Sequence, residues 1–277
     1  MGRLKERLAA QYQGASGRTI KQWLEAGRVQ VNGRVVRRGD VEIVSGDQVR
    51  LGGTPPPPFP SQLRLVHEDA HVVVVDKPAG LLTIATTKER DWTAYRLVAD
   101  YLAARPETRH PRHPVFVVHR LDRETSGLLV FAKSPEVKAA LQKQFAQRSV
   151  ERVYVAVVEG RVRDDTGTLR HRLHEDRGLR VQVGRGGVGR DAVTHYRVLV
   201  RGAATTRLEI RLETGRRGQI RAQLAELGHP IVGDTAYGSP RDPLRRVCLH
   251  ATRLGFLDVE RGAVRFESTV PPGFTKL

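Results

Sequence analysis

A proline-rich segment at residues 54–60 is the feature that most restricts how this chain can fold. It reads Thr-Pro-Pro-Pro-Pro-Phe-Pro. Because proline lacks a backbone N–H and has a fixed φ, neither a helix interior nor a central strand can run through this segment. Consecutive prolines instead favour polyproline II, a semi-rigid extended spacer. We therefore expect two domains, at residues 1–53 and 62–277, joined by a linker at residues 54–61.

The charge of the chain indicates a polyanionic partner. Its 277 residues include 47 Lys and Arg against 30 Asp and Glu, which gives a formal net charge of +17. This excess favours binding to nucleic acid; an arginine-rich composition without that role is the alternative. No apolar run approaches the roughly 18 residues of a membrane span, and the start has no signal-peptide pattern. With a single cysteine, Cys248, no internal disulfide can form, and we expect a cytoplasmic protein.

Residues 1–53 have the pattern of a small α/β domain. Helices are expected at residues 3–10 and 19–26, the second ending before a glycine. The Asn32-Gly33 pair between two short valine-containing segments predicts a β-hairpin with a tight turn.

This N-terminal segment resembles the small RNA-binding domain first described in a ribosomal small-subunit protein. The residues that carry the resemblance are 18–24, 27–33 and 46–47. The resemblance implies that Arg18, Lys21 and Asn32 contact RNA. For Arg18 and Lys21 the alternative is an ordinary solvated helix face.

Residues 62–277 have the pattern of an α+β domain. Many neighbouring strands with short turns and few crossover helices predict a mixed, largely antiparallel sheet. Helices are expected at 92–104, 135–147 and 218–227, and strands at 63–66, 72–75, 115–118, 128–131, 150–158, 180–183, 192–200, 207–212, 247–254 and 264–267.

A polar turn at residues 119–127 separates two of the expected strands. Its carboxylate, Asp122, stands between the cations Arg120 and Arg123. Nearby positive charge favours the ionised form of a carboxylate, which a nucleophile or general base requires. The alternative is a surface turn in which the aspartate caps backbone groups.

Two patterns that could hold a cofactor or metal lack the necessary context. Residues 184–189 have the spacing of a dinucleotide-binding fingerprint, but a strand follows them where a helix is required, so a hairpin tip is expected. The pairs His110/His113 and His171/His174 lack nearby carboxylate or thiolate partners. We expect neither a cofactor nor a metal.

Further motifs follow in an order that resembles the RNA pseudouridine synthases of the RluA type. They lie at residues 76–80, 119–122, 125–127, 153–156, 214–221, 228–234, 237–238 and 249–251. The N-terminal module makes the chain similar to the RluC/RluD subgroup. The resemblance implies a pseudouridine synthase catalytic domain, and a reaction that converts uridine within RNA to pseudouridine with no cofactor.

The same resemblance assigns roles to individual residues. Asp122 is implied as the catalytic carboxylate, either attacking the sugar or removing a sugar proton. Arg221 is implied to pair with Asp122, and Tyr154 to stack on the uracil ring. Arg120 is implied to fill the space that the flipped base leaves, and Ile220 is expected among the base-binding residues. Core packing for Tyr154 and a solvated position for Arg221 are the alternatives.

One position departs from the family. Gly218 stands where members usually carry a histidine before Gln-Ile-Arg. We expect ribosomal RNA as substrate, with transfer RNA as the alternative, and a monomer. Two other functions stay open: an RNA chaperone without turnover, and a hydrolase with Asp122 as nucleophile.

Overall fold

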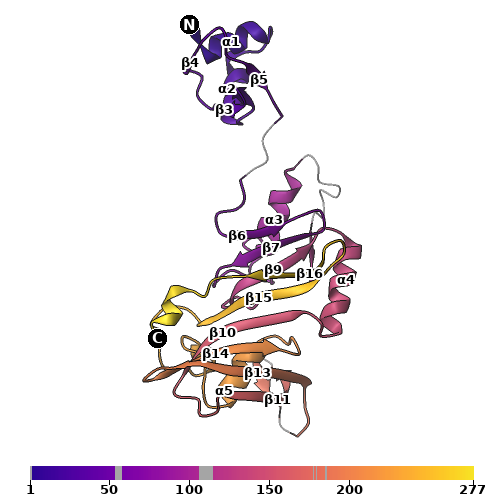
Figure 1. The fold of residues 1–277 in the computed structure, drawn as a ribbon, viewed down its shortest axis with the longest axis vertical. Coiled ribbons are helices and arrows are strands. Elements are labelled where there is room, and N and C mark those ends of the chain that lie inside the picture. Colours follow the sequence, from indigo (N-terminus) through magenta and orange to yellow (C-terminus); the bar gives the residue numbers. More distant parts are fainter. Residues whose placement is uncertain (1, 54–57, 106–114, 177, 179, 185) are drawn as a thin grey trace. The chain divides into compact units, whose positions relative to one another are not determined.

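The computed structural model describes residues 2–53, 58–105, 115–176, 178, 180–184 and 186–277. The chain divides into two compact units, Met1–Pro58 and Phe59–Leu277 (Figure 1). Most of the prolines of the expected linker, at residues 54–57, lie outside the described residues.

The N-terminal unit is a small α/β domain. Helices α1 (Leu4–Gln11) and α2 (Gly17–Glu25) share an apolar cluster with strands β2 (Val29–Val31) and β5 (Val49–Leu51). Strand β3 (Arg34–Val35) pairs with β2, and β1 (Gly2–Arg3) pairs with β4 (Glu42–Ile43). Asn32 and Gly33 have φ of 51° and 79°, the left-handed conformation of a tight hairpin turn. The hairpin expected there is present, since β2 and β3 pair antiparallel.

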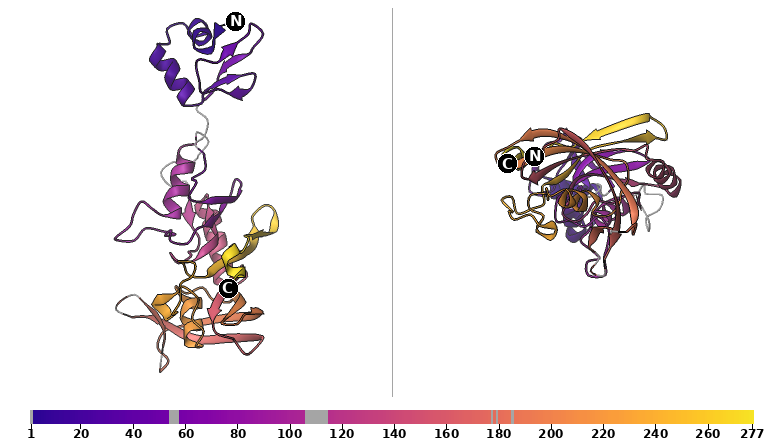
Figure 2. Two further views of the ribbon diagram at one scale, coloured as in Figure 1. Left: turned by 90° about the vertical axis from the view of Figure 1, so that its left-hand side faces the viewer. Right: turned by 90° about the horizontal axis from the view of Figure 1, so that it is seen from below.

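The second unit is built on one large sheet. In the part of the chain that the structure describes, this sheet has eleven strands, in the order β12-β11-β13-β14-β10-β15-β9-β7-β6, with β16 on β15 and β8 on β9. Their bounds are β6 Arg64–Glu68, β7 Val72–Lys77, β8 Phe116–Val117, β9 Ser126–Ala132, β10 Glu151–Glu159, β11 Thr166–Glu175, β12 Val181–Val183, β13 Arg190–Arg201, β14 Thr205–Leu212, β15 Leu249–Asp258 and β16 Gly262–Glu267. The pairing of β15 with β9 is parallel and the other pairings are antiparallel. The expected α+β fold with a mixed, largely antiparallel sheet is confirmed, and Figure 2 shows from two further sides that its strands twist.

Helices α3 (Ala94–Ala103) and α4 (Pro135–Ala146) pack into two different apolar clusters. Along β7, Val73 and Val75 belong to the cluster with α3, whereas Val72 and Val74 belong to the cluster with α4. Because both faces of this strand are covered, its apolar residues are continuous instead of alternating with polar ones. Among the described residues of this unit, the remaining helices are α5 (Gln219–Glu226) and the short 3₁₀ turns η1 (Thr235–Tyr237) and η2 (Pro272–Thr275).

In the second unit, strand β11 and the segment at residues 184–189 differ from the sequence prediction. Strand β11 was not expected, because only Leu169 and Leu173 of its ten residues are buried, and the sequence there lacks an apolar alternation. The glycine-rich segment 184–189 is not a hairpin tip. Strands β12 and β13 on either side of it both pair with β11, so its described residues belong to a connection between strands that are not neighbours.

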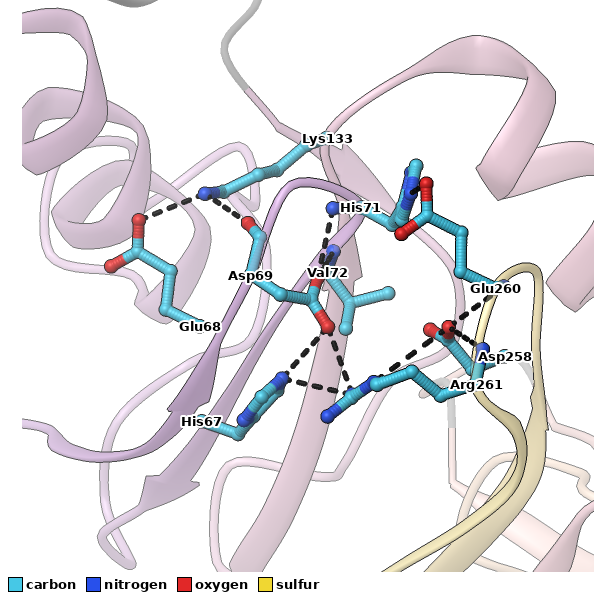
Figure 3. A network of polar contacts seen from close by, with 9 residues as sticks. All are labelled: His67, Glu68, Asp69, His71, Val72, Lys133, Asp258, Glu260 and Arg261. Atoms are coloured by element: carbon cyan, nitrogen blue, oxygen red, sulfur yellow. Dashed lines mark hydrogen bonds and ion pairs between the residues drawn. The ribbon is translucent and has the colours of Figure 1, made fainter.

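A polar network joins two turns of the sheet (Figure 3). Asp69, between β6 and β7, accepts hydrogen bonds from the backbone N–H groups of His71 and Val72, each at 2.8 Å. Arg261, between β15 and β16, donates from Nη2 to Asp69 at 2.8 Å and lies 3.0 Å from His67 Nε2. Side chains therefore fasten the edge strand β6 to the β15–β16 hairpin.

Candidate active site

The polar turn connects β8 to β9, as expected. The two strands pair antiparallel, Val117 opposite Phe131, and the chain reverses between them, where the Thr125 N–H donates to Asp122 O at 3.1 Å. Gly127 has φ of 114°, and a Cβ there would lie 2.3 Å from Ala251 O. Only glycine allows β15 to approach the start of β9 this closely.

Lys77 stabilises the turn through hydrogen bonds to backbone carbonyl groups. Its side chain is fully buried, and Nζ donates to the carbonyl oxygens of Pro78 at 2.9 Å, Leu81 at 2.7 Å and Arg123 at 3.3 Å. Burial lowers the pKa of Lys77 to about 7, an effect that nearby carboxylates partly offset. The three acceptors satisfy an ammonium that would otherwise be unpaired inside the protein.

Thr83 stabilises the residue that precedes Asp122. Its hydroxyl donates to Leu121 O at 2.7 Å and accepts from Leu121 N at 3.1 Å. The Gly80 N–H also donates to Arg123 O at 2.7 Å. The backbone is thus held on both sides of Asp122, and a carboxylate so placed needs little reorganisation before it reacts.

His119 connects the start of the turn to α4. Its Nε2 accepts a hydrogen bond from Val130 N at 3.2 Å, and its ring stacks on Phe145 with centroids 4.8 Å apart. Burial lowers the pKa of His119 to about 3, with a smaller contribution from the charge of Arg152. The imidazole is therefore neutral and acts as an acceptor that orders the turn.

Asp122 faces a cavity of about 440 Å³. Within the described residues, no hydrogen bond or ion pair engages its carboxylate, which leaves its oxygens available to a ligand. Burial raises the pKa of Asp122, against the opposing charges of Arg221 and Arg120. The charge of Arg120 favours the ionised form, as expected, but burial has the larger effect, and Arg221 rather than Arg123 supplies the strongest opposing charge.

Tyr154 and Ile220 form apolar walls of the same cavity. Tyr154 lies on β10 beside a bulge against β15, and Ile220 lies in the first turn of α5. Both are buried, at 7% and 5% exposed. Burial raises the pKa of Tyr154 to about 12, so the phenol is neutral, and in the described part of the chain its hydroxyl has no hydrogen-bond partner.

Arg221 lines the cavity, but its partner differs from the one that the resemblance implied. Its Nε and Nη2 donate to the two carboxylate oxygens of Asp234 at 2.6 and 2.8 Å, and Nη1 donates to Glu124 at 2.8 Å. The expected pairing of Arg221 with Asp122 is therefore wrong; Arg221 acts on Asp122 only through its charge. Burial disfavours the Arg221 cation, yet the Asp234 bonds outweigh it and raise the pKa of Arg221.

The glycine at position 218 has a local explanation. Gly218 precedes α5 with φ of 58°, and a Cβ there would lie 3.1 Å from Tyr237 Oη and 3.4 Å from Val181 Cβ. Tyr237 donates to Val181 O at 3.0 Å, and its ring lies 5.0 Å from Arg221 Cζ. Tyr237 thus occupies the space into which a side chain at position 218 would project.

The remaining predicted RNA-binding residues lie in two places. Arg120 is exposed and lines the cavity. Arg18, Lys21 and Asn32 belong to the N-terminal unit, where Lys21 pairs with its own helix. The Asn32 amide donates to Asp47 at 2.8 Å and accepts from Gln48 N at 2.9 Å, so it is used within the domain.

Sequence reasoning missed the residues that support the site. Asp234 and Lys77 stood in recognised motifs without an assigned role. Arg148 and Arg152, which line the cavity, had no signal among the many arginines.

The described residues form neither a metal-binding cluster nor a membrane-spanning helix. Across residues 2–277 without the undescribed gaps, no group of three His, Cys, Asp or Glu side chains is placed to hold a metal. His110 and His113 lie outside the described residues. No helix in the described segments is long and apolar enough to cross a membrane.

Comparison with known proteins identifies the class. Residues 71–226 match the family described as RNA pseudouridylate synthase, and residues 2–49 match the S4 domain. The chain belongs to the RNA pseudouridylate synthase family, isomerases that convert uridine in RNA to pseudouridine.

Individual relatives agree with this class. Ribosomal large subunit pseudouridine synthase D of Neisseria meningitidis serogroup A is 37% identical over 98% of this chain and 76% of its own length. The protein of that name in Escherichia coli K12 is 33% identical over 91% and 82%. The uncharacterized RNA pseudouridine synthase YhcT of Bacillus subtilis is 34% identical over 87% and 80%.

Two solved structures show the same fold. Human RNA pseudouridylate synthase domain containing 1 has a TM-score of 0.60 at 23% identity, covering 77% of this chain and 86% of that one. Human RNA pseudouridylate synthase domain containing 4 has a TM-score of 0.61 at 23% identity, covering 76% and 90%.

Proposed function

We propose that this protein isomerises uridine to pseudouridine in large-subunit ribosomal RNA, with Asp122 as the catalytic carboxylate. The relatives named for that activity match it over most of both chains. The single observation that carries the proposal is the Asp122 carboxylate, which is fixed by its backbone and faces a cavity walled by Tyr154, Ile220 and arginines.

The cavity suits a flipped pyrimidine. A uracil ring has two apolar faces and polar edges, and Tyr154 and Ile220 offer flat or apolar surfaces to it. Extruding the base from its stack costs a few kcal/mol. Contacts between arginines and RNA phosphates offset this, so binding weakens as salt rises. Arg120, exposed at the cavity, is proposed to occupy the vacated place in the stack.

The reaction needs one ionised carboxylate. The bond between the sugar and N1 breaks, the base rotates, and C5 joins the sugar; C5 then loses its proton and N1 gains one, so the atoms balance. Asp122 starts this either by attack on the sugar or by removal of a sugar proton. We propose that Tyr154 keeps the detached base stacked, and that Arg221, held by Asp234, favours the charged form of Asp122.

Tritium release from RNA labelled at uridine C5 tests the proposal. Large-subunit ribosomal RNA, small-subunit ribosomal RNA and transfer RNA are assayed in parallel, with Asp122→Asn as the inactive control. Release from large-subunit RNA alone supports the assignment. Release from transfer RNA alone would replace the substrate, and no release from any RNA would reject the enzyme.

We also propose that the N-terminal unit binds RNA through Arg18 and Lys21, both exposed on α2. Replacing both by alanine is expected to weaken RNA binding. Unchanged affinity would contradict this role.

A ribosomal RNA substrate implies that the protein acts in the cytoplasm. We also propose that it acts as a monomer, which light scattering checks.

A further inference from the structure

Arg148 has a backbone conformation that favours glycine. It follows the end of α4, where its N–H donates to Phe145 O at 3.2 Å and Ser149 N donates to Gln144 O at 3.1 Å. Its φ is 61°, the left-handed region that usually holds glycine after a helix. The conformation alone assigns the side chain no role, since Arg245 shares it; the position of the Arg148 guanidinium does.

The side chain of Arg148 reaches the mouth of the active-site cavity. Arg148 lines the same cavity as Asp122 and Tyr154. Its guanidinium pairs with Glu213, which directly follows β14; the two side chains are 50% and 31% exposed. An ion pair this exposed contributes little to stability, so it can be exchanged for another anion at small cost.

A second arginine, Arg152, connects the two elements that carry Arg148 and Glu213. Arg152 on β10 is buried, and its Nη2 donates to Leu212 O at 3.3 Å and Glu213 O at 3.0 Å. Its guanidinium also lies 5.5 Å from the ring centroid of Phe145 on α4. The end of α4 and the end of β14 are therefore held together, and Arg148 is presented from a fixed position.

We propose that Arg148 binds a phosphodiester of the RNA strand next to the target uridine, exchanging Glu213 for phosphate. This rests on the proposed function. A guanidinium binds phosphate through two parallel hydrogen bonds, which sets orientation as well as affinity. Arg216 and Arg217 line the same cavity, so a strand whose uridine reaches Asp122 passes a positively charged rim.

The test compares two arginines that share a backbone conformation. Arg245 is also exposed and has φ of 52°, but it is not among the residues that line the cavity. Arg148→Gly and Arg245→Gly each remove one positive charge and relieve the left-handed conformation. Both are expected to unfold at the same or a higher urea concentration than the parent protein.

RNA binding separates the two variants. Affinity for a large-subunit ribosomal RNA transcript is measured at several salt concentrations in the Asp122→Asn background, where no turnover occurs. Arg148→Gly is expected to weaken binding about tenfold, as loss of one charge-assisted contact would. The slope of log affinity against log salt is expected to become shallower by about 0.7–0.9, the value for one phosphate. Arg245→Gly is expected to change neither.

An unchanged salt slope in Arg148→Gly, or an equal effect of Arg245→Gly, would overturn the proposal. A general disturbance of the fold lowers affinity without removing one counterion. Tritium release by the protein with Asp122 intact is measured separately. Its absence would reject the proposed enzyme, whereas the binding comparison decides the role of Arg148.

Discussion

Replacing Asp234 by asparagine breaks the buried half of the Arg221 pair. The Asp234 side chain is 1% exposed and that of Arg221 11%, and two hydrogen bonds join them at 2.6 and 2.8 Å. Removing one partner of a buried pair costs about 3–5 kcal/mol, because the other charge stays buried. Glu124, 42% exposed, still accepts from Arg221, so we expect the lower end, about 3 kcal/mol.

Urea unfolding followed by circular dichroism measures this change. With a slope of about 3 kcal/mol per molar urea, the loss moves the midpoint of the catalytic unit down by about 1 M. Asp165→Asn is the matched control. Asp165 pairs with Arg201 at 2.7 Å but is 84% exposed, so its loss costs under about 1 kcal/mol. A midpoint for Asp234→Asn that coincides with the control would refute the reasoning that burial makes the Arg221 pair important.

Three further substitutions test other parts of the site. Asp122→Asn is expected to abolish tritium release. It is also expected to be more stable than wild type at neutral pH, because burial raises the pKa of Asp122 and disfavours its charge. This gain in stability disappears as the pH falls below the ordinary carboxyl pKa, and urea titrations at neutral and at low pH check it. The pKa of Lys77 is lowered to about 7, so the unfolded chain binds more protons than the folded one between pH 7 and about 10. The free energy of unfolding of wild type, relative to that of Lys77→Met, should therefore rise by up to about 1.4 kcal/mol per pH unit in this range. A difference that does not depend on pH would contradict this. Gly218→Ala is expected to cost about 1–2 kcal/mol in thermal unfolding, because φ is 58° and the new Cβ would crowd Tyr237.

The fold and the centre of the site were largely predictable from the sequence. Continuous apolar segments such as 72–75 and 128–131 predicted buried strands, and the turn between two of them predicted the position of Asp122. These are local patterns, which neighbouring residues determine. Strand β11 was not predicted because it is exposed along most of its length and its pairing depends on other segments of the chain.

The partners of the site residues could not be predicted in the same way. Arg221 and Asp234 are 13 residues apart, and Lys77 contacts Arg123 across 46 positions. Which carboxylate pairs with Arg221 depends on how α5 packs on the sheet, and no periodic pattern in the sequence predicts that packing. Likewise, charges adjacent to Asp122 are visible in the sequence, whereas the burial that raises its pKa is not.

The way in which the turn at residues 119–127 is held has a consequence for how this enzyme can diversify. Lys77 and Thr83 bind main-chain groups of the turn, at Arg123 and Leu121. Every amino acid supplies those groups, so exposed side chains such as Arg120 can be exchanged without displacing Asp122. Under the proposed roles of Arg120 and Asp122, mutation would alter the contacts with RNA and leave the reacting carboxylate in place.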